Sequence, residues 1–218
     1  MPQWSPDGLQ LAYAYGDGLY IIPAVGGEPR KLASLPGWEG QTVRWSPDGR
    51  FLAAFGYATP EAENNAVFVV PVSGGELRQL TPDNVYKEGL QWHPGGQRLT
   101  YHASLDNSET RQAYLDGRSP SLLVNHENPV FWDYVGTWAP DGRRFFFFSS
   151  DVRKEEGKKD RSGVYVYDES SGSVTLFSHN SGLPRWSHDG KTMAWTTGKQ
   201  VSQLWLAENI PMEADVDR

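Results

Sequence analysis

Short runs in which apolar and polar residues alternate recur along the whole chain. Examples are LYIIPAV at 19–25, AVFVVPV at 66–72 and GVYVYDE at 163–169. A period of two, with many β-branched and aromatic residues, predicts strands rather than helices. We find no segment that keeps a period of 3.6 over the length of a helix. The pattern therefore predicts an all-β chain.

A tryptophan followed by a tight turn returns five times. The copies are QWSPDGLQLAYAY, RWSPDGRFLAA, QWHPGGQRLTY, TWAPDGRRFFF and RWSHDGKTMAW, and they begin at residues 3, 44, 91, 137 and 185. Their tryptophans are Trp4, Trp45, Trp92, Trp138 and Trp186, at spacings of 41, 47, 46 and 48 residues. Repeats of this length that consist of strands are typical of four-stranded propeller blades. We expect the repeat tryptophans to pack between neighbouring blades.

The turn chemistry predicts the strands inside each repeat. In the first copy, Pro6 presets φ for the turn, Ser5 and Asp7 bond to nearby backbone, and Gly8 adopts positive φ without strain. This predicts a hairpin, and a Gly-Gly turn at 26–27 predicts a second one. The strands expected in the first repeat are one ending at Trp4, Leu9–Tyr15, Gly18–Pro23 and Pro29–Ala33, and the second repeat is expected to contain Ala66–Val72 and Leu77–Thr81.

These motifs resemble those of a known family. The runs LYIIPAVGGEPRKL and VFVVPVSGGELRQLT, together with WSPDG, are similar to the repeats of TolB-like β-propellers. Dipeptidyl-peptidase-like and tricorn-like proteases have similar WD-like repeats in their propeller domains. The resemblance extends over nearly the whole chain. It implies a β-propeller of antiparallel four-stranded blades, a bacterial periplasmic or envelope setting, and envelope proteins as partners.

The repeats divide the chain into five blades. We expect one propeller domain over 1–210, with repeats at about 2–40, 41–89, 90–134, 135–183 and 184–210, and an acidic tail at 211–218. Gly95 stands where the other copies have Asp, and the fifth repeat stops after its third strand. The ring is therefore either five-bladed or part of a six-bladed ring. An open ring would expose strand edges that favour self-association.

Composition narrows the function classes. The chain has 218 residues, a net charge of −7 and no Cys, so we expect no nucleic-acid partner, no disulfide and no thiolate metal site. No apolar run approaches the roughly 20 residues that span a bilayer, so we expect no membrane insertion. The start, MPQWSPDG, lacks the basic and apolar segments of a signal peptide. The cellular compartment of the protein is therefore implied by the family resemblance alone.

Candidate binding residues lie in the loops that enter the first strand of a blade. Three of these loops place aromatic residues beside carboxylates, and the candidates are Trp38, Glu39, Tyr86, Glu88, Trp132, Asp133 and Tyr134. Such groups can anchor a protein interface, bind a cation, or stack on a sugar ring. The structural alternative is that the aromatic rings fill the channel of the propeller or pack on a neighbouring blade.

Catalytic motifs are missing from the sequence. The five His show neither HExxH nor His-x-His spacing, and GxSxG is absent. Two further hypotheses are weaker. One is a metal held by His102 and His126, and the other is a pair of carboxylates from Glu39, Glu88 and Asp133 that cleaves glycans. We expect no cofactor and no metal. The sequence favours a binding protein with a protein or peptide partner; the alternative is a carbohydrate-binding or carbohydrate-active propeller at the same mouth.

Light scattering tests whether the blades close on their own. Five blades that close on their own predict a monomer near the formula mass of 24.4 kDa. A dimer or a concentration-dependent aggregate would contradict closure and indicate open edges.

Overall fold

The structure is a computed structural model in which residues 2–34, 43–103, 109–125, 136–149, 162–179, 182–187, 189–199 and 201–208 are described. All regular elements in these ranges are strands, which confirms the all-β prediction. The chain forms two compact units, Met1–Asn125 and His126–Arg218, and each is described by itself. That the five repeats form one domain stays a prediction.

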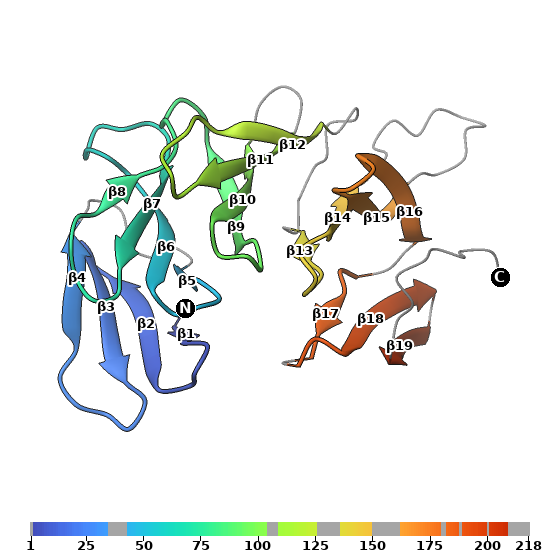
Figure 1. Cartoon of the computed structure of the whole chain (residues 1–218), viewed down its shortest axis with the longest axis horizontal. Helices are drawn as coiled ribbons and strands as arrows, with labels where there is room; N and C mark the ends of the chain where they lie inside the picture. The colour runs from blue at the N-terminus through green and yellow to red at the C-terminus, as the bar shows by residue number, and fades with distance from the viewer. Residues whose placement is uncertain are drawn as a thin grey trace. The chain divides into compact units, whose positions relative to one another are not determined.

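The first unit contains three four-stranded sheets, each antiparallel and each in chain order (Figure 1). The first sheet is β1 (Gln3–Trp4), β2 (Gln10–Tyr15), β3 (Gly18–Pro23) and β4 (Arg30–Ser34). The second is β5 (Val43–Trp45), β6 (Phe51–Gly56), β7 (Ala66–Pro71) and β8 (Arg78–Gln79). The third is β9 (Lys87–Trp92), β10 (Arg98–Ala103), β11 (Glu109–Tyr114) and β12 (Ser121–Asn125).

The second unit continues the same pattern. Its four-stranded sheet is β13 (Thr137–Trp138), β14 (Arg144–Ser149), β15 (Gly163–Asp168) and β16 (Ser173–His179). Its last sheet is β17 (Arg185–Trp186), β18 (Thr192–Lys199) and β19 (Val201–Glu208). Within the described part of the fifth repeat, the sheet has these three strands, as the sequence predicts. The tail at 211–218 lies outside the described residues.

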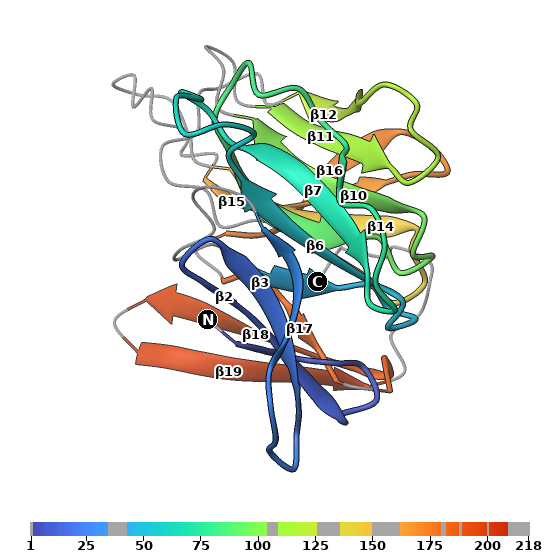
Figure 2. The same cartoon turned by 90° about the vertical axis from the view of Figure 1, so that its left-hand side faces the viewer.

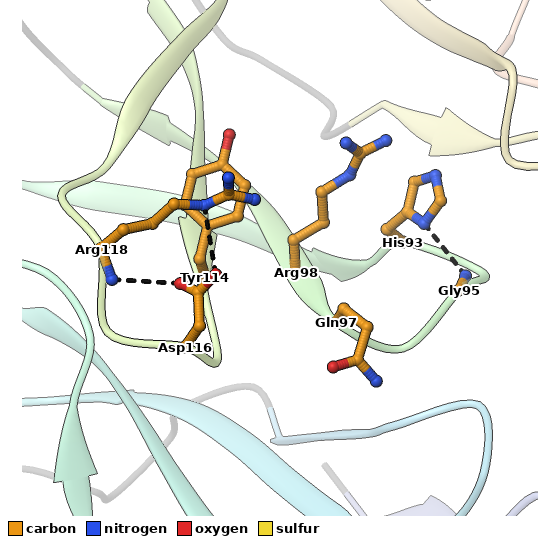
Figure 3. A pocket seen from close by; sticks show the side chains of 7 residues that line it. All are labelled: His93, Gly95, Gln97, Arg98, Tyr114, Asp116 and Arg118. Carbon is orange, nitrogen blue, oxygen red and sulfur yellow. Dashed lines mark hydrogen bonds and ion pairs between the residues drawn. The ribbon is translucent and has the colours of Figure 1, made fainter.

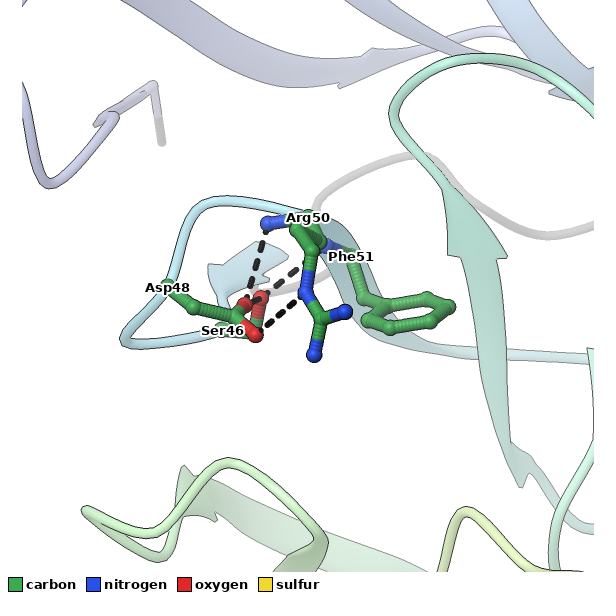
Figure 4. Close-up of polar contacts among 4 residues, drawn as sticks. All are labelled: Ser46, Asp48, Arg50 and Phe51. Carbon is green, nitrogen blue, oxygen red and sulfur yellow. Dashed lines mark hydrogen bonds and ion pairs between the residues drawn. The ribbon is translucent and has the colours of Figure 1, made fainter.

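The repeated turn owes its shape to a serine and an aspartate. In the second blade, the Ser46 hydroxyl donates to Asp48 Oδ1 at 2.6 Å and accepts the Phe51 N–H at 2.9 Å. Asp48 Oδ1 also accepts the Arg50 N–H at 3.1 Å, while Arg50 Nε bonds Asp48 Oδ2 at 2.6 Å (Figure 4). Gly49 has φ 70°, which only glycine adopts without strain.

The same network recurs in other blades. The Ser5 hydroxyl, followed by the Leu9 N–H, holds the pKa of Asp7 below its usual value. The fifth blade has an equivalent pair, in which Ser187 Oγ donates to Asp189 Oδ1 at 2.6 Å. The turn therefore satisfies its own polar groups locally, so it forms wherever the motif occurs.

Successive blades of the first unit are joined by tryptophan side chains. Trp45 Nε1 donates to Gln3 O and Trp92 Nε1 donates to Arg44 O, both at 3.0 Å. Arg44 Nε returns a bond to Leu90 O at 3.2 Å. Each bond reaches from one blade to its neighbour, and Figures 1 and 2 both place the β5–β8 sheet beside the β9–β12 sheet.

Apolar faces fill the space between these blades. One buried cluster contains Leu19 and Ile21 of the first sheet with Leu52 and Val70 of the second. The next joins the opposite face of the second sheet, through Phe55, to Leu99 and Tyr101 of the third. The second sheet is therefore buried on both faces, which explains why β6 and β7 are nearly continuous apolar runs.

The repeat tryptophans do not all behave alike. Trp92 and Trp138 are buried, and Trp45 and Trp186 are half-buried. Trp45, Trp92 and Trp186 contact the sheet before their own, in agreement with the expected packing role. Trp4 is 61% exposed, because the described residues of the first unit contain no earlier sheet to receive its ring. The expectation that all five pack between blades is therefore not met at Trp4.

An aromatic core holds the second unit together. Phe146 meets the Phe177 ring edge-on at 5.3 Å between centroids and the Trp186 ring at 6.1 Å. Phe177 in turn contacts Trp195 at 5.6 Å. These rings come from both sheets of the unit, so aromatic packing joins the two sheets.

Replacing Asp48 by alanine should lower the free energy of unfolding by about 1–2 kcal/mol, because the Ser46 hydroxyl and the Arg50 N–H both lose their acceptor. Urea denaturation measures this loss. The matched control is Asp17→Ala, which removes only an exposed ion pair with Lys31 and should cost about 0.5 kcal/mol or less. Equal losses in the two variants would show that the turn network adds no stability.

Candidate functional site

The candidate site lies at the end of the third sheet where β9 begins. Tyr86 immediately precedes β9 and Glu88 is its second residue. Residues two apart on an extended segment point to the same side, so the ring and the carboxylate lie together. Tyr86 is 48% exposed, which makes its ring available to a partner. The structure thus brings together this one predicted pair of aromatic and acidic residues.

The second blade contributes Tyr57 to the surroundings of Tyr86 and Glu88. Burial, followed by the charges of Glu88 and Tyr57, raises the pKa of Tyr86. Tyr57 directly follows β6, so it comes from the neighbouring sheet. The Tyr86 hydroxyl is protonated at neutral pH, as an ordinary tyrosine is, and the raised pKa extends its role as a hydrogen-bond donor to more alkaline pH.

Lys87 lies between the exposed Tyr86 and the half-buried Glu88 and is itself 1% exposed. Its Nζ donates to Val85 O at 2.7 Å and to Asn65 O at 3.0 Å. The Asn65 side chain completes the link: Oδ1 accepts the Lys87 N–H, and Nδ2 donates to Lys87 O, both at 2.7 Å. Three of these hydrogen bonds fix the start of β9 against Asn65, directly before β7, and the fourth, to Val85 O, orients the amine within its own segment. The Tyr86 ring and the Glu88 carboxylate are carried by this fixed segment.

Sequence reasoning did not identify Lys87 or Asn65 as parts of the site. A lysine flanked by an aromatic and an acidic residue is normally read as a solvated charge. The only signal is its position in KEGLQW, where strand alternation places it on the side opposite to Tyr86 and Glu88.

Burial lowers the pKa of Lys87 to about 8, and the charge of Arg111 acts in the same direction while Asp83 opposes it. A neutral amine still has two N–H groups, which is enough for both carbonyl acceptors. The clamp around β9 is therefore preserved when the lysine loses its proton.

The other five predicted residues cannot be compared with the structure. Trp38, Glu39, Trp132, Asp133 and Tyr134 lie outside the described residues. His126 also lies outside them, while His102 is buried in β10. Among the described residues, no three His, Cys, Asp or Glu side chains form a group that could hold a metal ion. No helix in the described ranges is long and apolar enough to cross a membrane.

The exposed Tyr86 ring and the half-buried Glu88 carboxylate have two chemical uses. A positively charged side chain can lie over the Tyr86 face while it pairs with Glu88, at about 0.5–2 kcal/mol for the cation–π contact. A sugar can stack on the same ring and donate a hydroxyl to the carboxylate. One described carboxylate beside the ring provides binding groups, whereas glycoside cleavage requires a pair.

The pH dependence of stability tests the burial of Lys87. Its folded pKa lies below the 10.5 of a free lysine, so the unfolded chain binds more protons between about pH 8 and 10.5. Stability must therefore rise with pH in that window. From about pH 7 to about pH 9.5, the wild type should gain about 2 kcal/mol relative to Lys87→Met in urea unfolding. A difference that stays constant would show that Lys87 keeps an ordinary pKa.

Comparison with known proteins agrees with this architecture. No family model matches the chain. An uncharacterized protein of Agrobacterium fabrum is 26% identical over 208 residues, which cover 88% of this chain and 67% of that protein. The Tol-Pal system protein TolB of Alcanivorax borkumensis is 32% identical over 94 residues, covering 42% of this chain and 20% of TolB.

Solved structures extend the likeness to almost the whole chain. TolB from Acinetobacter baumannii matches with a TM-score of 0.64 at 18% identity, over 95% of this chain and 51% of that one. The tricorn protease matches with a TM-score of 0.69 at 14% identity, over 95% of this chain and 27% of that one. The chain thus spans about half the length of the solved TolB. The repeats, the meandering sheets and these likenesses together show that the chain has the blade architecture of a TolB-like β-propeller.

Proposed function

We propose that this chain is a non-catalytic TolB-like propeller that binds a protein or peptide through the aromatic and acidic ends of its blades. The observation that carries the proposal is the exposed Tyr86 ring beside Glu88, on a segment fixed by the buried Lys87. The other mouth residues predicted from the sequence extend the same chemistry to the neighbouring loops.

The fixed backbone favours a binding role. A side chain on a rigid segment loses little freedom on association, so more of the contact energy appears as affinity. Tyrosine is among the residues that most often contribute the largest share of interface energy. Tyr86 combines both properties, because its ring is exposed while the adjacent Lys87 is anchored to the second blade through Asn65.

The charge of the site favours a partner with basic side chains. Glu88 lies beside the Tyr86 ring, and the chain carries a net charge of −7. A lysine or arginine of a partner can pair with the carboxylate and stack on the ring. The TolB likeness favours an envelope protein as the partner, and an envelope location for the chain. The glycan alternative uses the same ring and is an outcome of the test below.

Peptides selected from a displayed random library on the immobilised wild-type chain provide a defined ligand for the test. Replacing Tyr86 by alanine should weaken the binding of a selected peptide by about 2 kcal/mol, or about thirtyfold in Kd. Fluorescence anisotropy measures this change. Trp132→Ala should have an effect of similar size. The control is Leu9→Ala, since Leu9 is also exposed but follows the first blade's SPDG turn.

Unchanged affinity in both aromatic variants would refute the assignment of the binding surface. A parallel glycan array separates the two ligand classes. Binding of glycans that depends on Tyr86, without selection of any peptide, would replace the protein partner by a carbohydrate.

A further inference from the structure

The first sheet has one face that no other sheet of the first unit covers, as far as the described residues of that unit extend. Cross-strand partners leave a sheet on the same side, and Tyr13 of β2 is opposite Tyr20 of β3. Trp4 is 61% exposed and Tyr15 is 71% exposed. The side chains of this face, called the Trp4 face, are Trp4, Leu11, Tyr13, Tyr15, Tyr20 and Ile22. Most of them are aromatic, which makes the face a candidate interface.

The second sheet shows what such a face does when it is covered. The repeat aligns Trp4 with Trp45 and Leu11 with Leu52. Leu52 is fully buried in the cluster that joins the first and second sheets, and Trp45 Nε1 donates to Gln3 O of the first sheet. In the second sheet, these positions thus bind the sheet before it. The Trp4 face therefore carries the residues by which one sheet of this chain packs on another.

Two tyrosines distinguish the Trp4 face from its covered counterpart. Tyr13 and Tyr20 occupy the positions of Ala54 and Phe68 in the second sheet. Their rings are stacked, with 5.5 Å between centroids, and a Cβ at position 18 would overlap the Tyr20 ring, so Gly18 leaves room for it. Tyrosine hydroxyls can remain hydrated, and tyrosine is enriched at protein interfaces. The face therefore suits an association between molecules better than a permanent core.

Two charged side chains flank the Trp4 face and neutralise each other. Lys31 of β4 is opposite Tyr20, and its Nζ lies 5.9 Å from the centroid of the Tyr20 ring. The same Nζ lies 3.0 Å from Asp17 Oδ1. The whole chain carries a net charge of −7, so two copies repel each other least where a surface is locally neutral. The Trp4 face meets this condition.

The cavity of about 270 Å³ at the far end of the third sheet differs from this face (Figure 3). Arg118 in its lining stacks on the Tyr114 ring, 3.6 Å from the ring centroid, and its Nε lies 3.5 Å from Asp116 Oδ2. Arg98 and His93, also in the lining, have partners of their own. These groups are therefore engaged within the protein, whereas the aromatic rings of the Trp4 face are exposed or half-buried.

We propose that the Trp4 face packs against the same face of a second copy of this chain. An interface that uses one patch on both copies closes at a dimer. Aromatic and aliphatic side chains can interdigitate across it, and each tyrosine hydroxyl is both a donor and an acceptor. β2 and β3 are each six residues long, about 20 Å, so the face is smaller than the ~800 Å² per partner of standard interfaces. The dimer is therefore reversible.

Sedimentation velocity of the purified chain, from low to high micromolar concentration, tests this proposal. The wild type should shift from a monomer of 24.4 kDa towards twice that mass. Tyr13 lies in the middle of β2, an inner strand of the sheet, so a two-fold axis through the face brings its two copies close together. Tyr13→Glu and Tyr13→Lys should each raise the Kd of the dimer at least about tenfold, because like charges then face each other.

Mixing the two variants separates loss of the interface from loss of the fold. In an equimolar mixture, the glutamate of one variant faces the lysine of the other, so we expect the dimer to return. A variant that fails to fold is not rescued in this way. Leu122→Glu is the matched control, because Leu122 is 47% exposed on β12 of the third sheet, and it should leave the dimer unchanged.

A wild type that stays monomeric, a dimer that Tyr13→Glu leaves unchanged, a mixture that stays monomeric, or equal loss in Leu122→Glu would each overturn the proposal. A monomeric wild type whose thermal unfolding temperature falls strongly in Tyr13→Glu would show instead that another part of the same chain covers the face. Tyr13 belongs to the first sheet, whereas Tyr86 directly precedes the third. All these results therefore leave the proposed partner site unaffected.

Discussion

The first unit depends on the hydrogen bond by which an indole N–H of one blade meets a backbone carbonyl of the blade before it. Trp45 and Trp92 make this bond to Gln3 and Arg44, and Arg44 returns one to Leu90. The carbonyls lie on β1 and β5, the short first strands of their sheets, so the bond fixes the spacing of neighbouring sheets where these strands approach one another. The apolar faces can then pack, because a set spacing lets side chains such as Phe55 and Leu99 interdigitate.

The third blade carries different chemistry at its two ends. At the start of β9, burial of Lys87 fixes a segment that carries an exposed aromatic ring beside a half-buried carboxylate. At the far end, where Gly95 replaces the motif aspartate, Arg118 stacks on Tyr114 beside a cavity. Leu90, Leu99 and Ala113 form the buried apolar centre of the same sheet. Function is therefore assigned to the loops and turns, where a change of residue does not disturb the packing.

The fold was predictable from the sequence to the extent that its causes are local. The Ser–Asp turn closes within six residues, so it could be read directly, and Gly18–Pro23 was expected with its observed bounds. The predicted strand Leu77–Thr81 is shorter in the structure, Arg78–Gln79, because its length depends on pairing with β7. Trp4 differs because packing requires an earlier sheet, which a motif alone does not supply.

The sites were less predictable, because their contacts join residues that are far apart in the sequence. Tyr86 and Glu88 were found from their place before a repeat tryptophan, but the clamp on Lys87 comes from Asn65, 22 residues away. The cavity requires the register that sets Arg98 opposite Tyr114 and a contact made by the following turn. Neither contact follows from periodicity. Five of the predicted site residues lie outside the described ranges, so their grouping stays a prediction.

The burial of Lys87 makes its amine more reactive and at the same time shields it from reagents. An amine with a pKa of about 8 is partly unprotonated near neutral pH, which makes it intrinsically more nucleophilic than a surface lysine. Yet it is enclosed, so an acylating reagent reaches it only when the start of β9 detaches from Asn65. The rate at which this one lysine is acylated therefore reports how often the junction between the second and third blades opens.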